Sequence, residues 1–305
     1  MKLSIVSTLY YSSKYIKEFC ERVIKSIPAE FNEFEIILVD DGSPDDSLSK
    51  AIELKKSIPE IKILELSRNF GHHKALMTGL KEAVGDFVFL IDSDLEEPPE
   101  LLSKFWSELS TSKDCDVVFG VQDKRKGGWY ERNSGKLFYS LFNLLSDQGE
   151  IDKNFLTIRL MTKRFVSELV KIEDQEFYFA PANSFTGFKK KSIVVVKSSS
   201  SKSTYTFSIK FHMLLNSILS NSSKPLYFIF YSGILVTLFS ICFSIYYLSL
   251  FLMEGVQVDG WTTIILLNTF FGGVIIFFLG IIAIYVSKIF NETRRRPFSI
   301  IRRIY

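Results

Sequence analysis

The chain has 305 residues and an almost balanced charge, with 37 Lys and Arg against 34 Asp and Glu and a formal net charge of +3. This small basic excess gives no reason to expect nucleic-acid binding. The three cysteines are far apart and predict neither a disulfide framework nor a zinc site: Cys20, Cys115 and Cys242. Apolar residues are distributed unevenly, so the chain divides into a first part typical of soluble α/β proteins and a last part typical of membrane proteins.

The first part alternates apolar strands with helices. Strands are expected at 2–8, 34–39, 61–67 and 86–92, and helices at 13–27, 43–58 and 72–84. Continuous apolar strands that alternate with helices are typical of a parallel sheet covered on both faces. The N-terminal residues contain no apolar stretch long enough for a signal peptide, so this α/β domain is expected to stay in the cytosol.

The middle of the chain is less regular. A fifth strand is expected at 116–123, a loop and an amphipathic helix at 127–147, a short strand and a helix at 157–169, and a strand with a serine-rich loop at 192–207. Residues 207–224 have apolar positions at helical spacing just before a long apolar run. They predict a helix that lies in a membrane interface, and a packed connector helix remains an equally good interpretation.

Two long windows near the C-terminus contain no charged residue and no histidine. They are Pro225–Met253 and Gly260–Ser287, and each is longer than the roughly 20 residues that a membrane helix needs. The basic residues lie outside these windows, at Lys224 and in the tail, so both ends are expected in the cytoplasm and the connecting loop outside, in a multi-pass inner (plasma) membrane protein. The basic tail at 289–305 is either a topology signal or a contact with anionic headgroups.

Acidic residues follow two of the expected strands directly. Asp40 and Asp41 end the second strand, and Asp92 and Asp94 end the fourth in the stretch FLIDSDLEEPPELL. Ligands of parallel α/β sheets bind at the carboxyl ends of the strands. Carboxylates suit Mg²⁺ or Mn²⁺, which commonly hold substrate phosphates. A D-x-D sequence alone is weak, because surface loops often contain one, but its place after a buried strand favours a cation site.

Three segments in series carry a family resemblance: VDDGSPDDS, LSRNFGHHKALMTGL and FLIDSDLEEPPELL. In this order they resemble family 2 glycosyltransferases, in the branch of dolichol-phosphate mannose synthase and bacterial polyprenyl-phosphate (bactoprenol) glycosyltransferases. The resemblance covers essentially the whole chain. It implies a GT-A domain at 1–206, followed by the interfacial helix at 207–224, a transmembrane hairpin at 225–288 and the basic cytoplasmic tail at 289–305.

The resemblance also implies a function and a set of site residues. The function is inverting transfer of a sugar from a UDP- or GDP-linked donor to polyprenyl phosphate. Nucleotide-sugar contacts are implied for Thr8, Tyr10, Asp40, Asp41 and Arg68. Catalytic roles are implied for Asp92, Asp94 and Glu96, with Mg²⁺ or Mn²⁺ on Asp92 and Asp94, and contacts to the acceptor phosphate for Arg125, Arg132 and Lys136.

Each of these residues also has an ordinary structural interpretation. Asp40 or Asp41 is well placed to cap the following helix. Tyr10 could equally be an aromatic residue of the core. The basic residues could equally be solvated surface charges: Arg68, Arg125, Arg132 and Lys136. His72 and His73 do not predict a metal site, because adjacent helical residues point in different directions and two ligands do not complete one.

Departures from the family pattern lie in the acceptor half of the chain. Thr157 stands where an acid is expected, although Arg159 is retained, and the segment Lys197–Ser203 lacks the usual Arg and Gly. Two alternatives therefore stay open. One is a transferase of the same fold that adds sugar to a hydroxyl of a lipid-linked glycan, with Glu96 or Asp123 as base. The other is a non-catalytic membrane partner that binds nucleotide sugar. The sequence leaves the sugar, the metal and a homo-oligomeric state undetermined.

Overall fold

The computed structural model describes residues 1–112, 114–122, 155–172, 174, 179, 186–196, 222–254, 260–294 and 296–305. These residues fall into two compact units. The sheet unit contains the described residues up to 196 together with 296–305. The hairpin unit contains the described residues from 222 to 294.

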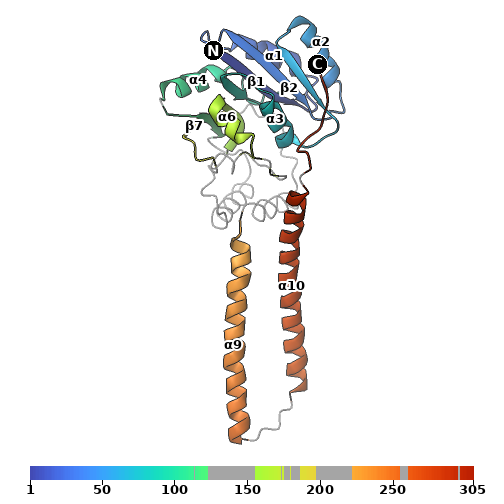
Figure 1. Cartoon of the computed structure of the whole chain (residues 1–305), viewed down its shortest axis with the longest axis vertical. Coiled ribbons are helices and arrows are strands. Elements are labelled where there is room, and N and C mark those ends of the chain that lie inside the picture. The colour runs from blue at the N-terminus through green and yellow to red at the C-terminus, as the bar shows by residue number, and fades with distance from the viewer. Residues whose placement is uncertain are drawn as a thin grey trace. The chain divides into compact units, whose positions relative to one another are not determined.

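The sheet unit is built on one mixed sheet whose described strands run in the order β7-β5-β6-β4-β1-β2-β3-β8 (Figure 1). The strands are β1 (Lys2–Leu9), β2 (Glu33–Asp40), β3 (Ile61–Leu66), β4 (Phe87–Leu90), β5 (Val117–Gln122), β6 (Phe155–Thr162), β7 (Lys190–Val195) and β8 (Ile301–Ile304). The helices of this unit are α1 (Ile16–Lys25), α2 (Ser47–Ser57), α3 (His72–Lys81), α4 (Leu101–Thr111) and α6 (Lys163–Leu169).

The expected parallel arrangement holds for the block β4-β1-β2-β3, and β6 and β8 are antiparallel additions at its two sides. Leu9 pairs with Asp40 at the carboxyl ends of β1 and β2, and Asp40 pairs with Glu65 on β3. Since β4 also runs parallel to β1, the loops after these strands leave the same edge of the sheet.

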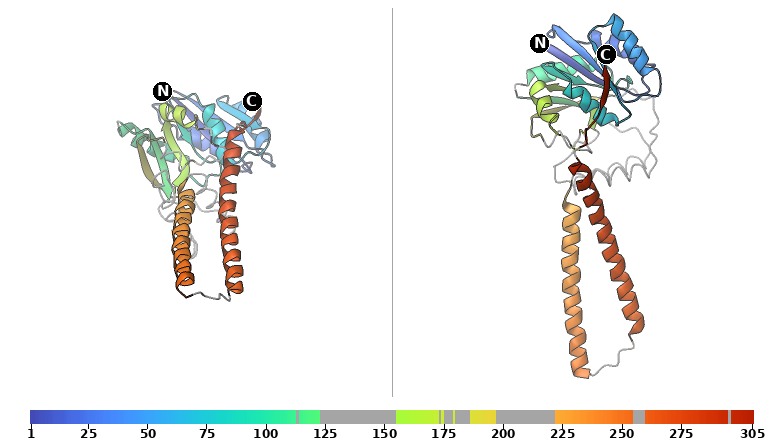
Figure 2. Two further views of the ribbon diagram at one scale, coloured as in Figure 1. Left: turned by 60° about the horizontal axis from the view of Figure 1, so that its bottom comes forward. Right: turned by 45° about the vertical axis from the view of Figure 1, so that its right-hand side comes forward.

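Side chains that alternate along the strands fill two cores, one on each face of the sheet. Ile36 and Leu38 pack with residues of α1, α2 and α4, whereas Ile37 and Val39 pack with residues of α3 and α6. This layering can be followed in Figures 1 and 2. The contact of α3 with the sheet requires glycine at Gly79, because a Cβ atom there would lie 2.5 Å from Val6 Cγ1. The last turns of α3 are thereby packed closely against β1 and β2.

The C-terminal residues differ from the expectation of a basic tail over 289–305. Helix α10 continues to Thr293, and β8 pairs with β3 at the edge of the sheet. Backbone bonds join Ile63 and Tyr305 in both directions, at 3.0 and 3.3 Å. Phe298 is 9% exposed and belongs to the core beneath α3. The tail assignment is therefore corrected: its apolar residues and its backbone complete the sheet unit.

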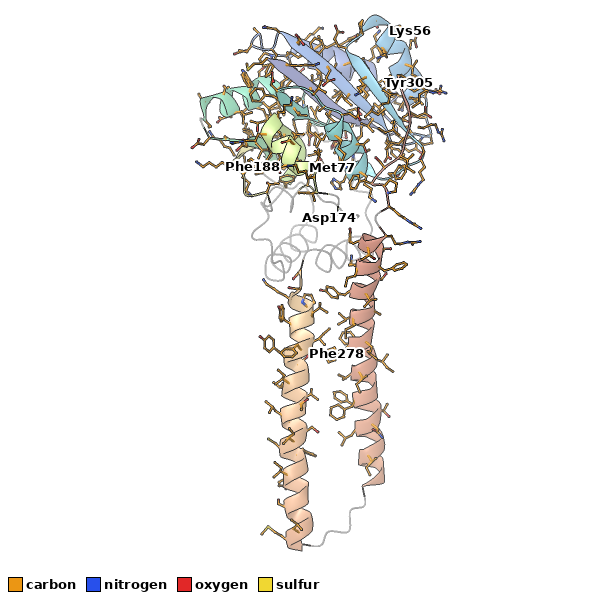
Figure 3. All side chains as sticks on the ribbon, viewed as in Figure 1. Lys56, Met77, Asp174, Phe188, Phe278 and Tyr305 are labelled. Atoms are coloured by element: carbon orange, nitrogen blue, oxygen red, sulfur yellow. The ribbon has the colours of Figure 1, made fainter. Side chains whose placement is uncertain are left out.

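The hairpin unit consists of α9 (Lys224–Glu254) and α10 (Trp261–Thr293). The two helices run antiparallel (Figure 1). Tyr285 Oη of α10 donates to the backbone oxygen of Ser222 at 2.8 Å. Each contains a window long and apolar enough to cross a membrane, Lys224–Phe243 and Leu267–Thr293, with no part of either window buried in the protein. Figure 3 shows apolar side chains projecting outward along both helices. The expected interfacial helix lies outside the described residues, except for its last three positions.

Candidate active site

Serine hydroxyls tie the loops after β1 and β4 together. Ser93, the middle residue of D-x-D, donates from Oγ to the backbone oxygen of Thr8 at 2.7 Å, and its Oγ is 2.8 Å from Ser12 Oγ. Both serines are buried, with 3% and 4% of their surface exposed. The D-x-D segment is thus fixed against the end of β1, which sequence reasoning missed because serine is common in loops of every kind.

Asp41 organises the segment that leads into α3. Its carboxylate accepts the backbone N–H groups of Phe70 at 2.7 Å and Gly71 at 3.0 Å. Burial raises the pKa of Asp41, and these two hydrogen bonds act in the opposite direction. Asp41 therefore does not cap a helix: it holds the loop residues that precede α3, whose N-cap Gly71 receives no side-chain cap. The carboxylate that meets the first turn of α2 belongs to Asp45, which accepts Ser47 N–H at 3.1 Å.

Asp40 lies on the other face of the same strand end and is 3% exposed. Its Oδ1 accepts the backbone N–H of Ser43 at 3.3 Å. Burial is the largest cause that raises its pKa, to about 6, and the nearby charge of Glu65 adds to the effect. A carboxyl with this pKa is able to change its protonation state close to neutral pH.

The adjacent histidines at the start of α3 point in different directions, as expected. His72 Nδ1 is 3.2 Å from Thr8 Oγ1, and His72 Nε2 is 3.4 Å from Asp92 Oδ1. The ring of His73 instead packs 5.6 Å from that of Phe179, and burial lowers the pKa of His73 to about 4. His72 thus joins the ends of β1 and β4, a role that adjacency on a helix did not reveal.

The second aspartate of D-x-D faces solvent. Asp94 is exposed, and its Oδ1 accepts the backbone N–H of Glu96 at 3.0 Å. Leu95 between them has a φ of +61°, a left-handed conformation that residues other than glycine rarely adopt. Such backbone strain is concentrated at functional sites. The turn presents Asp94 outward at the carboxyl edge of the sheet.

Aromatic side chains stand at the end of β1. Tyr10 is 49% exposed, so its interpretation as a core aromatic is wrong. Its ring lies 4.9 Å from that of Tyr11, edge to face. Tyr11 has a φ of +55°, and its backbone N–H donates to Ser43 Oγ at 2.9 Å. Arg68 is exposed as well, with its guanidinium 4.3 Å from the ring centre of Phe70.

Behind D-x-D lies a fully buried arginine. Arg159 is 0% exposed, and its guanidinium is 4.3 Å from the ring centre of Phe179. Its Nε donates to the backbone oxygen of Thr157 at 2.8 Å. Burial lowers the pKa of Arg159 to about 9, and the negative charges of Asp92 and Glu97 act against this shift. The positive charge of Arg159 is therefore buried in the sheet unit, where it interacts electrostatically with Asp92 and Glu97.

The donor set at β4 suits a cation that shares its ligands with substrate. Within the described ranges, no three or more His, Cys, Asp and Glu side chains are arranged to enclose a metal ion. Mg²⁺-type sites commonly use only one or two carboxylates and take their other ligands from water and phosphate. Asp92 and Asp94, placed two apart at one strand end, fit that kind of site.

The expected acceptor residues cannot be located. Arg125, Arg132, Lys136 and the alternative base Asp123 lie outside the described residues, as does Lys197–Ser203. In contrast, three residues that were predicted to contact the nucleotide sugar or the metal, Thr8, Asp41 and Asp92, all contact the segment Phe70–His72.

Comparison with known proteins identifies the family. Residues 4–172 match the model of glycosyl transferase family 2. A relative described as "Putative glycosyltransferases" from Mycobacterium tuberculosis is 44% identical over 305 residues, which cover 100% of this chain and 89% of the relative. The bactoprenol glucosyl transferase of Shigella phage SfV is 27% identical over 304 residues, covering 99% and 98%.

A solved structure supports the fold. Glucosyl-3-phosphoglycerate synthase from Mycobacterium tuberculosis, in complex with Mn²⁺, uridine diphosphate and phosphoglyceric acid, matches with a TM-score of 0.50 and 15% identity, over 72% of this chain and 78% of that one. The chain therefore belongs to glycosyl transferase family 2, and it is a glycosyltransferase with a GT-A fold.

Proposed function

We propose that this enzyme is a membrane-anchored, inverting glycosyltransferase that moves a sugar from a nucleotide sugar to polyprenyl phosphate. The observation that carries the proposal is the convergence of Thr8, Asp41 and Asp92 on one short segment at the carboxyl edge of the sheet. Two helices long and apolar enough to cross a membrane and the full-length match to a bactoprenol glucosyl transferase support the lipid acceptor.

Donor binding is assigned to the strand ends. Tyr10 offers an exposed ring to the base, Asp40 a buried carboxyl, and Arg68 an exposed cation suited to phosphate. Asp92 and Asp94 would hold Mg²⁺ or Mn²⁺, and the Mn²⁺ in the complex of the solved GT-A neighbour supports this choice. When bound, such an ion supplies positive charge to the departing diphosphate as a Lewis acid.

The reaction needs no protein base. A phosphate monoester is already anionic near neutral pH, so its oxygen attacks the anomeric carbon directly. The new carbon–oxygen bond forms as the bond to the diphosphate oxygen breaks, and the nucleoside diphosphate leaves with its electron pair. Arg125, Arg132 and Lys136 are proposed to bind the acceptor phosphate and offset the repulsion between the two anions.

A hydroxyl acceptor is the second candidate, and Glu96 distinguishes it. Glu96 lies two residues after Asp94, whose carboxylate accepts the backbone N–H of Glu96 at 3.0 Å, so it is the candidate general base on this loop. If Glu96 deprotonates a hydroxyl, Glu96→Gln abolishes transfer. If the acceptor is a phosphate, Glu96→Gln reduces transfer much less than Asp94→Ala does. The family assignment identifies the chain as a transferase, so the non-catalytic alternative is not carried further.

The experiment uses membranes that contain the full chain, polyprenyl phosphate and labelled UDP- or GDP-sugars. We expect label in an organic-extractable product that mild acid releases, and a loss of about 10²–10³-fold for Asp94→Ala. Asp114→Ala is the matched control, because Asp114 is an exposed aspartate before the start of β5 whose carboxylate forms an ion pair with Lys189 at 2.8 Å. An acid-resistant product would contradict the phosphate acceptor, and full activity of Asp94→Ala would contradict the assigned site.

The hairpin is proposed to anchor the enzyme with both of its ends in the cytoplasm. Residues on both sides of it, up to 196 and from 296, belong to the sheet unit, which two crossings leave on one side of the membrane. Cysteine introduced at Gln257, in the connecting loop, should react with an impermeant reagent added outside intact cells. Labelling only after the cells are opened would contradict this topology.

A further inference from the structure

His72 lies between two residues of the proposed donor site. Its Nδ1 is 3.2 Å from Thr8 Oγ1 at the end of β1, and its Nε2 is 3.4 Å from Asp92 Oδ1 at the end of β4. A neutral imidazole with its proton on Nε2 suits both neighbours, because Nδ1 accepts from the hydroxyl and Nε2–H faces the carboxylate in an electrostatic contact whose geometry falls short of a hydrogen bond. The three side chains form an ordered path from one strand end to the other.

The backbone that carries His72 is itself held in place. Gly71, with a φ of +101°, precedes the helix, and its carbonyl accepts Ala75 N–H at 3.0 Å. Asp41 binds the N–H groups of Phe70 and Gly71. The end of β2 thus fixes the start of α3, and the imidazole reaches from there to β1 and β4. A side chain on a fixed backbone with two contacts has little freedom to rotate.

A carboxylate binds a cation, and through it a diphosphate, more tightly when the orientation of the carboxylate is fixed before binding. A freely rotating Asp92 side chain would lose conformational entropy on binding, and that loss would weaken the complex. A ring N–H donated to a carboxylate is a common means of orienting groups around a metal. Asp92 has 22% of its side chain exposed, so it is accessible while His72 contacts it.

We propose that His72 is a positioning residue, which orients Asp92 for donor binding and uses the Thr8 hydroxyl to orient its own ring. The proposal rests on the proposed function, in that Asp92 must take part in binding the nucleotide sugar. His72 acts through Asp92 and does not itself bind substrate. Its two nitrogens have separate tasks, which amide side chains of different length can test separately.

The test compares His72→Gln, His72→Asn and His72→Ala in the purified full chain. The amide nitrogen of Gln can replace Nε2–H toward Asp92, whereas that of Asn lies near the position of Nδ1 and cannot reach the carboxylate. Binding of uridine diphosphate with Mn²⁺ is measured by calorimetry, with guanosine diphosphate instead if the donor screen selects it. Lys81→Gln, at the far end of the same helix, is the matched control.

We expect His72→Ala and His72→Asn to weaken binding about 10–100-fold, and His72→Gln to recover most of it. Melting temperatures should stay close to that of the unchanged protein. The Michaelis constant for the donor should rise more than kcat falls. Equal losses in all three variants, or a fall in binding that only follows a fall in melting temperature, would show a merely structural role and overturn the proposal.

Nucleotide binding by Asp92→Ala distinguishes a failure of the His72 proposal from a failure of the proposed donor site. If Asp92→Ala loses nucleotide binding while all His72 variants bind normally, the positioning role is wrong and the donor site stands. If Asp92→Ala also binds normally, the assigned donor site is itself wrong. If His72→Ala does not fold, the difference between the Gln and Asn variants still decides the question.

Discussion

The sheet unit and the hairpin unit use the same kind of side chain in opposite ways. Phe89 and Phe105 in the sheet unit are 0% exposed, whereas Phe228 and Phe239 in α9 are 68% and 64% exposed. Burial of apolar surface against helices stabilises the first unit in water. The second unit satisfies its backbone hydrogen bonds within each helix and leaves its apolar surface outward, which suits lipid. The difference shows which unit depends on internal packing and which on its surroundings.

The largest expected effect tests internal packing. Phe89→Ala should lower the free energy of unfolding of the sheet unit by about 3–5 kcal/mol, because it leaves a cavity between β4 and α4. Phe239→Ala, the matched change in α9, should leave that free energy within about 0.5 kcal/mol. Guanidinium unfolding in detergent, followed by tryptophan fluorescence, measures both. Equal effects of the two changes would contradict the inference that the sheet unit depends on internal packing and the hairpin unit does not.

An arginine substituted for an exposed apolar residue tests whether lipid or water surrounds that residue. Ile276 in α10 is 72% exposed and Val84 in the sheet unit is 53% exposed. Ile276→Arg should cost about 2.5–3.5 kcal/mol of membrane insertion, whereas Val84→Arg should change stability by no more than about 0.5 kcal/mol. Extraction of membranes with alkaline carbonate reports the first effect and thermal unfolding the second. Unchanged integration of Ile276→Arg would argue against α10 as a membrane span.

The pH dependence of stability tests burial of charge in the sheet unit. Burial raises the pKa of Asp40 to about 6, from about 3.9 in the unfolded chain. The folded state therefore keeps its proton between about pH 4 and 6 after the unfolded state has lost it. This stabilisation is complete below about pH 4 and is lost as the pH rises through 6.

Asp40→Asn should remove this contribution, which is on the order of 1–3 kcal/mol. Relative to the unchanged protein, the variant should therefore gain stability as the pH rises from 4 to 7. Urea unfolding at several pH values measures the difference. Parallel curves for the two proteins would contradict the raised pKa. Asp41 and Glu65, whose charges also act on Asp40, remain in both proteins, so the difference reports Asp40 together with its coupling to these two carboxylates.

The smallest expected effect tests whether the C-terminal residues stabilise the sheet unit. Tyr305 Oη donates to Glu65 Oε2 at 2.9 Å across the pair β8 and β3. Tyr305→Phe removes this bond and should lower the stability of the sheet unit by about 1 kcal/mol. Thermal unfolding detects this, and Tyr231→Phe on the exposed surface of α9 is the control. An equal effect of both changes would mean that the C-terminal residues do not stabilise the sheet.

Local sequence patterns were enough to predict the parallel block and its acidic edge. Short continuous apolar runs that alternate with helices are typical of buried parallel strands, and acids that end parallel neighbouring strands lie at the same edge of the sheet. The positions of β6 and β8 could not be predicted in this way, since antiparallel pairing depends on contacts between distant segments. Arg302 and Arg303 made β8 resemble a solvated tail, although Arg302 pairs with Glu65 at 3.0 Å.

Sequence patterns identified the acidic residues that the fold places at one edge of the sheet, but not the contacts that these residues make; their roles in a site stay predictions. An aspartate that accepts backbone N–H groups, as Asp41 does, has the same sequence signature as one that contacts a ribose. The roles of His72 and Ser93 depend on three strand ends meeting, which only the folded chain reveals. The acceptor-side residues Arg125, Arg132 and Lys136 remain predictions.

The strand β8 also fixes the order in which this protein can be completed during synthesis. A ribosome translates it after both apolar helices, although it pairs with β3 from the first part of the sheet unit. The sheet therefore gains its outermost described strand only when the hairpin has already left the ribosome. A water-soluble version is accordingly better obtained by replacing the hairpin with a linker to residue 296 than by ending translation before α9, because truncation would expose the hydrogen-bonding edge of β3.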